Sequence, residues 1–542
     1  MCDQQYSQHR AKKWHCISIL SLLFLMLLGC KEPIPKLDVS LDERSLIPLP
    51  RKITPNGQTF VIYEKTKVYT STDTAAVAIA KQLIDKIQTA YGYELPLLEE
   101  GYATDAYGIY IGLTSNTVGN PNREAYHLKS TSQQLRLTAH HSSGLSRGIQ
   151  TLYQLLPDSI VNNITATGPS ASVLGVPGVE IKDYPNFAYR GAMLDVARHF
   201  FTVAQVKRFI DLMGQYKLNV LHLHLADDQG WRIHIKSWPK LTQIGGSSSV
   251  GDQGGGFFTQ DDYKEIINYA MARDITIIPE IDMPGHTNAA LASYPELNCD
   301  GIAPKLYTGM KVGFSSLCVQ KERTYEFLDD VIGEIAALTP GPYFHIGGDE
   351  SHATSKKDYI YFIERVQNIV KAHGKRVIGW EDIAAAPLTE GTIIQHWTNP
   401  ETASLGIRKG AKVILSPAAK TYLDMKYDKD SRIGLTWAGT TAIDSAYLWK
   451  PLEVLTTVSK AHILGIESPL WTETVVTTSD MDYLVFPRLI AHAELGWSKS
   501  SDLSWPSFKQ RLQQHLQRLD MMGVDYYKAP QLFTASNASP QK

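Results

Sequence analysis

Cysteine is scarce in this sequence, and neither sign of charge dominates. The 542 residues include 5 cysteines, 53 Lys and Arg, and 55 Asp and Glu, which gives a formal net charge of −2. So few cysteines exclude a disulfide-rich scaffold, and a charge near zero gives no attraction to nucleic acid or to an anionic membrane surface. We therefore expect an ordinary globular protein with no nucleic-acid partner.

We interpret the strongly apolar N-terminus of the chain as a targeting signal. Basic residues between positions 10 and 13 precede an apolar run over 17–28, which ends at Gly29 and Cys30. This order is typical of a secretory signal, and the run is too short for a comfortable transmembrane helix. The sequence LLGC resembles a bacterial lipobox, so we expect export and lipid anchoring through Cys30 to a bacterial membrane, facing the periplasm or at the cell surface. An ordinary cleaved signal with a chance cysteine is the alternative.

The other cysteines divide into two groups. Cys2 and Cys16 would leave with the signal, and Cys30 would carry the lipid. Cys299 and Cys318 remain, close in sequence and flanked by loop-like residues. In an exported protein such a pair indicates a disulfide that closes a short loop, with two free thiols as the alternative.

Composition and periodicity divide the chain into five segments. They are a lipoprotein signal peptide (1–30), a tether (31–45), a small α/β domain (46–183), a catalytic barrel domain (184–525) and a C-terminal tail (526–542). In the small domain, strands are expected near 60–63 and 108–112, and helices over 75–91 and 143–156. No cluster of catalytic residue types occurs there.

From about Phe187 onward, apolar runs alternate with amphipathic helical stretches, which is typical of β/α units around a parallel sheet. The expected strands are 188–196, 218–226, 275–282, 342–349, 375–381, 391–398, 411–416 and 463–471. Helices are expected over 203–216, 260–273, 322–338, 356–373 and 506–522. Eight strands favour a (β/α)₈ TIM barrel, preceded by the small α/β domain, over an open sheet. Two long connections, 228–258 and 284–321, are of the length that usually carries function.

In such a barrel, catalytic side chains lie at the carboxyl ends of the strands. Those ends are rich in carboxylate, histidine and tryptophan: Asp195, Arg198, His199, Asp227, Asp228, Glu280, Asp282, His286, Asp349, Glu350, Trp380, Glu381, Asp382, Trp397, Trp471 and Glu473. The sequence lacks a serine nucleophile elbow and a glycine-rich phosphate loop. Acid/base chemistry on an uncharged, aromatic-lined substrate indicates glycoside hydrolysis. We expect no cofactor and no metal, since His222 and His224 alternate on one strand without further ligand spacing.

The most specific element is the segment 343–350 (YFHIGGDE), an apolar strand that runs through two glycines into Asp349 and Glu350. Successive strand residues point in opposite directions, so this pair cannot easily flank one glycosidic bond as acid and nucleophile. The geometry makes sense if the substrate's own 2-acetamido oxygen is the nucleophile. Glu350 then protonates the leaving oxygen, and Asp349 holds the acetamido N–H. A solvated helix start is the structural alternative for an isolated Asp-Glu pair.

From about Leu46 to Ser498 the chain resembles the β-N-acetylhexosaminidases of glycoside hydrolase family 20. Five motifs carry the resemblance in the family's order: 190–200 (RGAMLDVARHF), 222–232 (HLHLADDQGWR), 279–286 (PEIDMPGH), 345–350 (HIGGDE) and 470–473 (LWTE). The segment Glu467-Ser-Pro departs from the family's pattern, and we expect it to alter the rim of the pocket. The resemblance implies a (β/α)₈ barrel and substrate-assisted cleavage without a cofactor.

The resemblance also implies roles for individual residues. The catalytic group comprises Glu350 as general acid/base, Asp349 as the carboxylate that orients the acetamido group, Tyr422 as donor to the acetamido oxygen, and His286 with Asp227 as a pair that supports the acid/base. Asp228 stays open as the partner of His286. The substrate-binding group comprises Arg190 for the 3- and 4-hydroxyls, Asp424 and Glu473 for the 4- and 6-hydroxyls, and Trp380, Trp397 and Trp471 as aromatic walls.

These observations predict an exo-acting, retaining β-N-acetylhexosaminidase that releases terminal β-linked GlcNAc or GalNAc from glycans or chitooligosaccharides. Two alternatives are a lacto-N-biosidase-type enzyme that releases a disaccharide, and a glycan-binding lipoprotein that has lost activity. The preferred sugar, the natural glycan and the oligomeric state cannot be read from the sequence.

Overall fold

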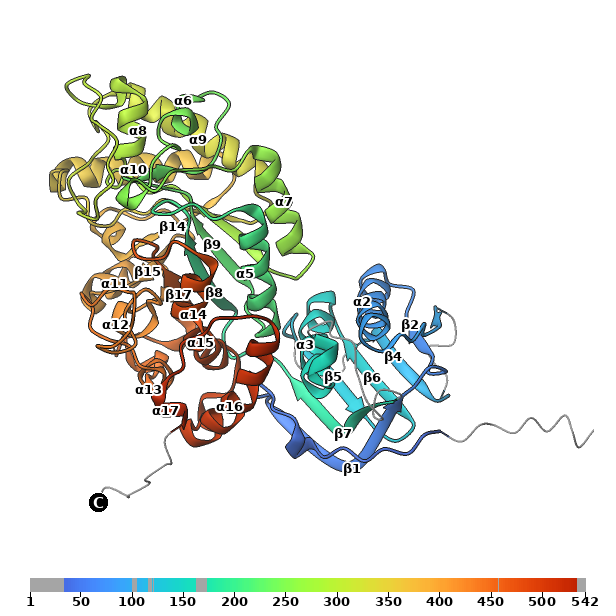
Figure 1. Cartoon of the computed structure of the whole chain (residues 1–542). Helices are drawn as coiled ribbons and strands as arrows, with labels where there is room; N and C mark the ends of the chain where they lie inside the picture. Colours follow the sequence, from blue (N-terminus) through green and yellow to red (C-terminus); the bar gives the residue numbers. More distant parts are fainter. Residues whose placement is uncertain are drawn as a thin grey trace, which may run out of the picture.

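The structure, a computed structural model, describes residues 34–99, 105–115, 119, 121–161, 173–456 and 458–533. It contains a small α/β domain and a barrel domain that lie side by side (Figure 1). The signal peptide, Cys30 and the end of the predicted tail lie outside the described residues. No helix of the described part is long and apolar enough to cross a membrane.

The small domain is a seven-stranded sheet with helices packed on it. Its strands, in spatial order, are β1 (Lys52–Ile62), β7 (Leu174–Asp183), β5 (Tyr126–Ser130), β6 (Gln134–Ala139), β4 (Gly108–Leu113), β2 (Val68–Thr70) and β3 (Leu97–Leu98). The main helices are α2 (Thr74–Tyr91) and α3 (Ser142–Leu155). Both helices turn a buried apolar stripe towards the sheet, so this domain has a core of its own.

The second domain is a closed barrel of eight parallel strands, as the sequence predicts. The strands are β8 (Tyr189–Asp195), β9 (Val220–His224), β12 (Thr276–Glu280), β13 (Tyr343–His345), β14 (Arg376–Trp380), β15 (Ile393–His396), β16 (Lys412–Leu415) and β17 (Ile463–Leu470). The longer helices around them are α5 (Val203–Gln215), α7 (Gln260–Met271), α9 (Glu322–Leu338), α10 (Lys356–Ala372), α11 (Pro400–Arg408), α14 (Thr478–Val485), α15 (Arg488–Trp497) and α16 (Trp505–Met521). Strand β17 pairs with β8, which closes the ring.

Local sequence explains where several helices begin. Helix α5 starts after Thr202, whose hydroxyl accepts the N–H of Gln205 while the Gln205 side chain accepts that of Thr202. Helix α7 has the same capping box at Thr259 and Asp262. Each box satisfies backbone donors that would otherwise be unpaired, which stabilises a helix end by about 1 kcal/mol.

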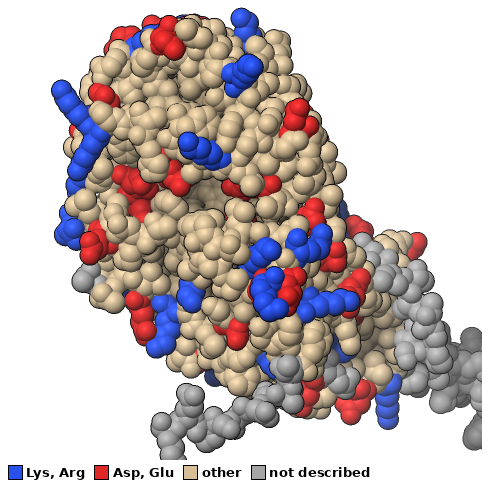
Figure 2. Space-filling view, turned by 60° about the vertical axis from the view of Figure 1, so that its left-hand side comes forward, with Lys and Arg blue, Asp and Glu red and all other residues tan. Residues whose placement is uncertain are grey.

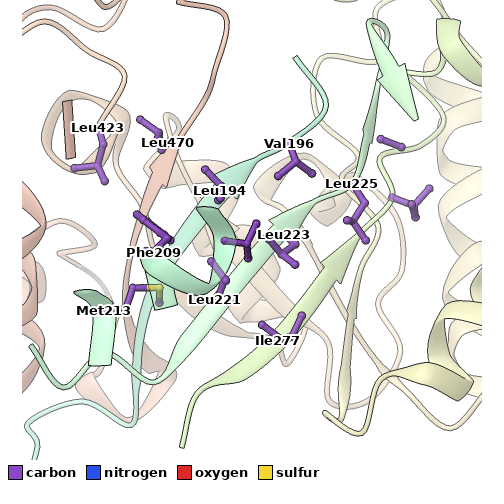
Figure 3. Close-up of a cluster of buried hydrophobic side chains, with 14 of the residues drawn as sticks. Leu194, Val196, Phe209, Met213, Leu221, Leu223, Leu225, Ile277, Leu423 and Leu470 are labelled. Atoms are coloured by element: carbon purple, nitrogen blue, oxygen red, sulfur yellow. The ribbon is translucent and has the colours of Figure 1, made fainter. Parts of the chain in front are cut away.

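The barrel strands and the helices bury a common apolar core. Phe209 and Met213 of α5 lie against Leu194 of β8 and Leu221 of β9, and all four side chains are almost completely buried (Figure 3). Burial of each such side chain contributes about 1.5–3 kcal/mol. This packing fixes the strand ends, and therefore the side chains that follow them.

Two of the predicted segment boundaries are wrong in part. Val39 and Ser45, which the sequence assigns to a tether, are buried, and His515 contacts the carbonyl oxygen of Ser45 at 2.8 Å. At the other end, Ala529 and Leu532 are fully buried although they lie in the predicted tail. Both segments contain apolar residues that the fold buries, so the packed chain extends from about Val39 to Leu532.

Candidate active site

The carboxylate pair at the centre of the prediction lies on a tight turn rather than on a strand. Strand β13 ends at His345, and the chain then passes through Gly347 (φ 64°), Gly348 (φ 102°) and Glu350 (φ 47°). A Cβ on Gly347 would lie 1.8 Å from an oxygen of Asp282, and the Gly348 N–H donates to that same oxygen at 2.9 Å. Only glycine fits such a left-handed, crowded backbone. The predicted strand over 342–349 is therefore too long, because this turn replaces its last residues.

The turn brings both carboxylates to one histidine. Nε2 of His286 lies 3.5 Å from Oε2 of Glu350 and 3.7 Å from Oδ2 of Asp349. Nδ1 of His286 lies 3.1 Å from Oδ1 of Asp227. Asp228 instead accepts from the Asn288 backbone and the Ser315 hydroxyl. Asp227 is therefore the partner of His286, and the open choice is settled by geometry.

Asp349 is buried beside a second carboxyl group, whereas the Glu350 side chain is partly exposed. One oxygen of Asp349 and one of Asp282 lie within 4.8 Å of each other and of a His286 nitrogen. Burial and the charge of Asp349 raise the pKa of Asp282 well above its usual value, and burial raises the pKa of Asp349 as well. Two buried carboxyl groups this close cannot both ionise cheaply, so they share a proton. Asp282 therefore lies beside Asp349 and shares its proton.

Aromatic side chains from the ends of β14, β15 and β17 and from the connection after β16 gather near Asp349. Trp380 and Trp471 have ring centroids 5.8 Å apart, and Tyr422 lies 6.2 Å from Trp471. Trp397 completes this group and donates its indole N–H to Asp382 at 3.1 Å. Burial and the charge of Asp349 raise the pKa of Tyr422 well above its usual value, so its hydroxyl is a donor at neutral pH. The result is an apolar pocket with one acidic and one hydroxyl group in its wall.

Asp424 and Glu473 form a second polar pair in the site. Both oxygens of Asp424 and one of Glu473 are buried, with no hydrogen-bond partner among the described residues. Burial and the charge of Glu473 raise the pKa of Asp424. Buried carboxylate oxygens without a donor are costly, and ligand hydroxyl groups would satisfy them. This pair therefore fits the binding of a polyhydroxylated ligand.

The structure contradicts the placement of Arg190. That residue opens β8 at the opposite end of the barrel, where its guanidinium donates to the carbonyls of Phe187 and Lys217 and pairs with Glu124 of the small domain. Side chains at strand beginnings point away from the catalytic face. Arg198 of the same motif lies at the catalytic end of the barrel instead: it follows β8, pairs with Asp227 at 2.8 Å, and lies 4.8 Å over the Trp471 ring.

The expectation for Glu467 is also wrong. It does not lie at the rim but in the barrel interior, fully buried, where it contacts Tyr189, His222 and Gln395. His345 is a packed barrel residue, with Nδ1 2.8 Å from Oε1 of Glu280. His222, His345 and Glu280 are close enough together to hold a metal ion, but here both histidines contact the Glu280 carboxylate directly.

Sequence reasoning missed Trp437 altogether. This residue is 54% exposed, and its ring lies 5.8 Å from Tyr422 and 6.1 Å from Trp397. It belongs to the long connection after β16, far from any strand end, so the position rule gives no signal for it. Acidic side chains flank a hollow in the surface of the molecule (Figure 2).

Two further features lie away from these residues. Cys299 and Cys318 form a disulfide with an S–S distance of 2.05 Å, as predicted, and it closes part of the long connection after β12. A cleft of about 680 Å³ lies between the small domain and the barrel, but none of the predicted site residues lines it.

The fold and site together define a class of protein. A TIM barrel whose strand ends hold a carboxylate–histidine–carboxylate group, an aromatic pocket and unsatisfied acidic groups is that of a glycoside hydrolase. Comparison with known proteins specifies the family. Residues 187–359 and 352–500 match the catalytic domain of glycosyl hydrolase family 20, and residues 43–184 match domain 2 of that family. The chain belongs to glycosyl hydrolase family 20.

Relatives and solved structures agree with this assignment. A β-N-acetylhexosaminidase of Cellulomonas fimi is 39% identical over 412 residues, which cover 76% of this chain and 81% of that protein. The family 20 β-N-acetylhexosaminidase of Streptomyces coelicolor A3(2) superposes with a TM-score of 0.86 at 45% identity, over 92% of this chain and 99% of that one. The N-acetyl-β-hexosaminidase of Streptomyces plicatus, solved with Thio-NAglucal, gives 0.86 at 46% identity, over 92% and 98%.

Proposed function

We propose that this glycoside hydrolase is an exo-acting, retaining β-N-acetylhexosaminidase that releases terminal β-linked GlcNAc or GalNAc by substrate-assisted catalysis. The observation that carries the proposal is the division of labour between adjacent residues. Asp349 is buried beside Tyr422 and the tryptophan pocket, whereas Glu350 is partly exposed beside His286. One carboxylate therefore addresses the acetamido group and the other the glycosidic oxygen.

The first step breaks the glycosidic bond. Glu350 donates its proton to the leaving oxygen while the acetamido carbonyl oxygen attacks C1, which forms an oxazolinium ring. Asp349 accepts the acetamido N–H and stabilises the positive charge, and Tyr422 donates to the acetamido oxygen. The tryptophan walls exclude water from this charge pair, which strengthens the electrostatic stabilisation.

The second step restores the enzyme. The Glu350 carboxylate takes a proton from water, the water oxygen attacks C1 from the face that the leaving group left, and the ring opens. Two inversions give net retention. Nδ1 of His286 faces the Asp227 carboxylate, so its other nitrogen is the one that faces Glu350 in both steps.

The unsatisfied acids support exo action. Asp424 and Glu473 accept the 4- and 6-hydroxyls of the terminal sugar in this proposal, and Arg198 takes the role at the 3- and 4-hydroxyls that the resemblance implies for Arg190. These groups would close the pocket beyond one sugar. A disaccharide-releasing enzyme would need space there, and a mere binding protein has no use for an acid beside an acetamido clamp.

We also propose that the chain is exported and lipid-anchored through Cys30. The lipobox-like sequence at 27–30 supports this, as does the Cys299–Cys318 disulfide, because disulfides persist in oxidising compartments. Cys30→Ser is expected to move the protein from the membrane fraction to the soluble exported fraction and to abolish incorporation of labelled palmitate. Unchanged membrane association would contradict the anchor.

Hydrolysis of p-nitrophenyl β-GlcNAc and β-GalNAc by the chain lacking residues 1–30 tests the enzymatic proposal. Release of nitrophenol that a GlcNAc-thiazoline inhibits is the expected result, with the β-anomer as the first product by NMR. Glu350→Gln is expected to retain activity only on substrates with good leaving groups. No release by a folded sample would contradict the proposal. Disaccharide glycosides would then test the biosidase alternative.

A further inference from the structure

The barrel interior contains a chain of alternating carboxylates and imidazoles that reaches the proposed acid/base. His224 lies at its centre, on the last position of β9. Its Nδ1 is hydrogen-bonded to Oε2 of Glu280, and its Nε2 lies 2.8 Å from Oδ2 of Asp227. The other oxygen of Asp227 contacts His286, whose far nitrogen faces Glu350 at 3.5 Å. An unbroken series of contacts therefore connects Glu280 with the acid/base.

The protonation states along this series follow from geometry. Both nitrogens of His224 contact carboxylate oxygens, and an ionised carboxylate only accepts hydrogen bonds, so the ring donates on both sides as an imidazolium. Although burial opposes it, Glu280 and Asp227 raise the pKa of His224 well above its usual value. The same imidazolium holds Asp227 in one orientation, because Oδ2 is occupied and Oδ1 alone is left for His286.

The other carboxylate oxygen of Glu280, Oε1, contacts a second part of the site. Oε1 accepts the indole N–H of Trp380 at 3.0 Å, and Trp380 forms a wall of the aromatic pocket. Glu280 is fully buried, so neither contact competes with water. A side chain bonded on both sides in this way fixes two elements relative to each other. The charged and titratable groups that face Glu280 are His222, His224, His345, Asp282 and Asp349.

We propose that Glu280 is a positioning residue. Through His224 it orients the Asp227–His286 pair that supports the acid/base, and through Trp380 it holds the wall of the acetamido pocket. These two parts of the site therefore keep a fixed position relative to each other. The inference rests on the proposed function, because it takes the roles of Glu350 and of the pocket from there. It adds that the two halves of the substrate-assisted step, proton donation and acetamido attack, are aligned by one buried carboxylate. Misalignment would therefore cost kcat rather than binding alone.

The chain supplies a matched control in Glu467. This residue is also a fully buried glutamate of the barrel interior, and it contacts the same neighbour, His222, at 3.0 Å. Among the described residues it has no hydrogen bond to His224 or Trp380; its other partners are Tyr189 and Gln395. Glu467→Gln should therefore change stability in the manner of Glu280→Gln without the change in chemistry.

The experiment compares Glu280→Gln with Glu467→Gln in the otherwise unchanged enzyme. Chitobiose has a poor leaving group that needs the acid, whereas 2,4-dinitrophenyl β-GlcNAc does not. Glu280→Gln is expected to lose about 100-fold in kcat on chitobiose and about 10-fold on the dinitrophenyl substrate, with a shifted pH profile. Glu467→Gln is expected to stay within about threefold on both substrates with an unshifted pH profile.

A double-mutant cycle tests the path through Asp227. If Glu280 acts through that carboxylate, then the chitobiose-specific part of the Glu280→Gln loss should largely vanish in an Asp227→Asn background. Equal losses in the two glutamine variants, a loss that follows only the change in Tm, or full additivity with Asp227→Asn would each overturn the proposal.

His224→Gln provides a second test if Glu280→Gln does not fold. It interrupts the path to Asp227 and leaves the Trp380 contact, so it should lose activity on chitobiose but not on the dinitrophenyl substrate. An unchanged chitobiose rate in the folded variant would overturn the proposal. Glu350→Gln is measured alongside: if it still cleaves chitobiose, the proposed function fails, whereas an inactive Glu350→Gln with an unaffected Glu280→Gln rejects only the positioning role.

Discussion

At the scale of single residues, the protonation of Asp382 makes the free energy of unfolding depend on pH. Burial and the charge of Asp349 raise the pKa of Asp382 from 3.8 to about 7, while its carboxylate accepts the indole N–H of Trp397. Between pH 3.8 and about pH 7, Asp382 keeps its proton in the folded protein but has released it in the unfolded chain. The free energy of unfolding therefore increases as the pH falls from about 7 towards 4, and this contribution is lost as the pH rises through about 7.

Asp382→Asn removes this titration and keeps an oxygen that accepts from Trp397. The Tm of the variant minus that of the wild type is expected to increase between pH 5.5 and pH 8.5, because only the wild type must bury a charge at the higher pH. Thermal unfolding in buffers of equal ionic strength measures it. A difference that does not vary with pH would contradict the assigned titration.

Arg198 and Arg190 lie in one motif, but substitution of the first is expected to lower activity and substitution of the second to lower stability. Arg198→Lys should lower kcat/KM by about 100-fold, because an ammonium cannot reproduce the forked contacts of a guanidinium at the sugar and at Asp227. Arg190→Lys should lower Tm and leave kcat/KM within about threefold, since Arg190 joins the barrel to Glu124 of the small domain. A reversed pattern would restore Arg190 as the sugar ligand.

This pair shows how far residue types alone carry a prediction. Motif resemblance finds both arginines, and the rule that strand ends carry function favours Arg198, which follows β8. Trp437 has no such signal, because its position depends on the path of a long loop. The partners of buried charges, such as Glu280 with Trp380, depend on barrel closure, which no local pattern reports.

At the scale of elements, the turn after β13 depends on glycine. Gly347→Ala places a methyl group 1.8 Å from Asp282 and enforces a left-handed backbone on alanine. We expect loss of activity by at least about 100-fold and a lower Tm, because the turn must move and the carboxylate pair moves with it. Gly410→Ala is the matched control: it has φ 95° and open space around its Cβ, so it should carry only the backbone cost.

All eight barrel strands could be predicted because each is an apolar run bounded by turn residues, and several of them are followed by an amphipathic helix. Their ends were less accurate. The expected strand over 342–349 stops at His345, because the Gly-Gly pair permits a turn that strand periodicity cannot reveal. The Gly-Gly pair is visible in the sequence, but no local pattern shows that it brings Asp349 and Glu350 to one histidine.

At the scale of the whole molecule, Asp183 joins the two domains. It ends β7 and accepts from Trp497 at 2.9 Å, from Tyr126 at 2.6 Å and from Lys217 at 3.1 Å, all of them buried. Asp183→Asn leaves the Lys217 ammonium buried without its counter-charge, which costs about 3–5 kcal/mol. We expect a lower Tm for the whole chain with kcat unchanged at low temperature, by calorimetry and assay. An unchanged Tm would show that the domains do not depend on this contact.

If the substrate's own acetamido oxygen is the nucleophile, the rate must depend on the electron density of that oxygen. A series of p-nitrophenyl β-glucosaminides with N-acetyl, N-fluoroacetyl, N-difluoroacetyl and N-trifluoroacetyl groups tests this dependence. Fluorine withdraws electrons from the carbonyl oxygen with little change in size. Because a weaker nucleophile raises the barrier, kcat is expected to fall steeply with each added fluorine, over several orders of magnitude in total. A kcat that is insensitive to fluorination would contradict it and would assign the nucleophile to the enzyme or to water.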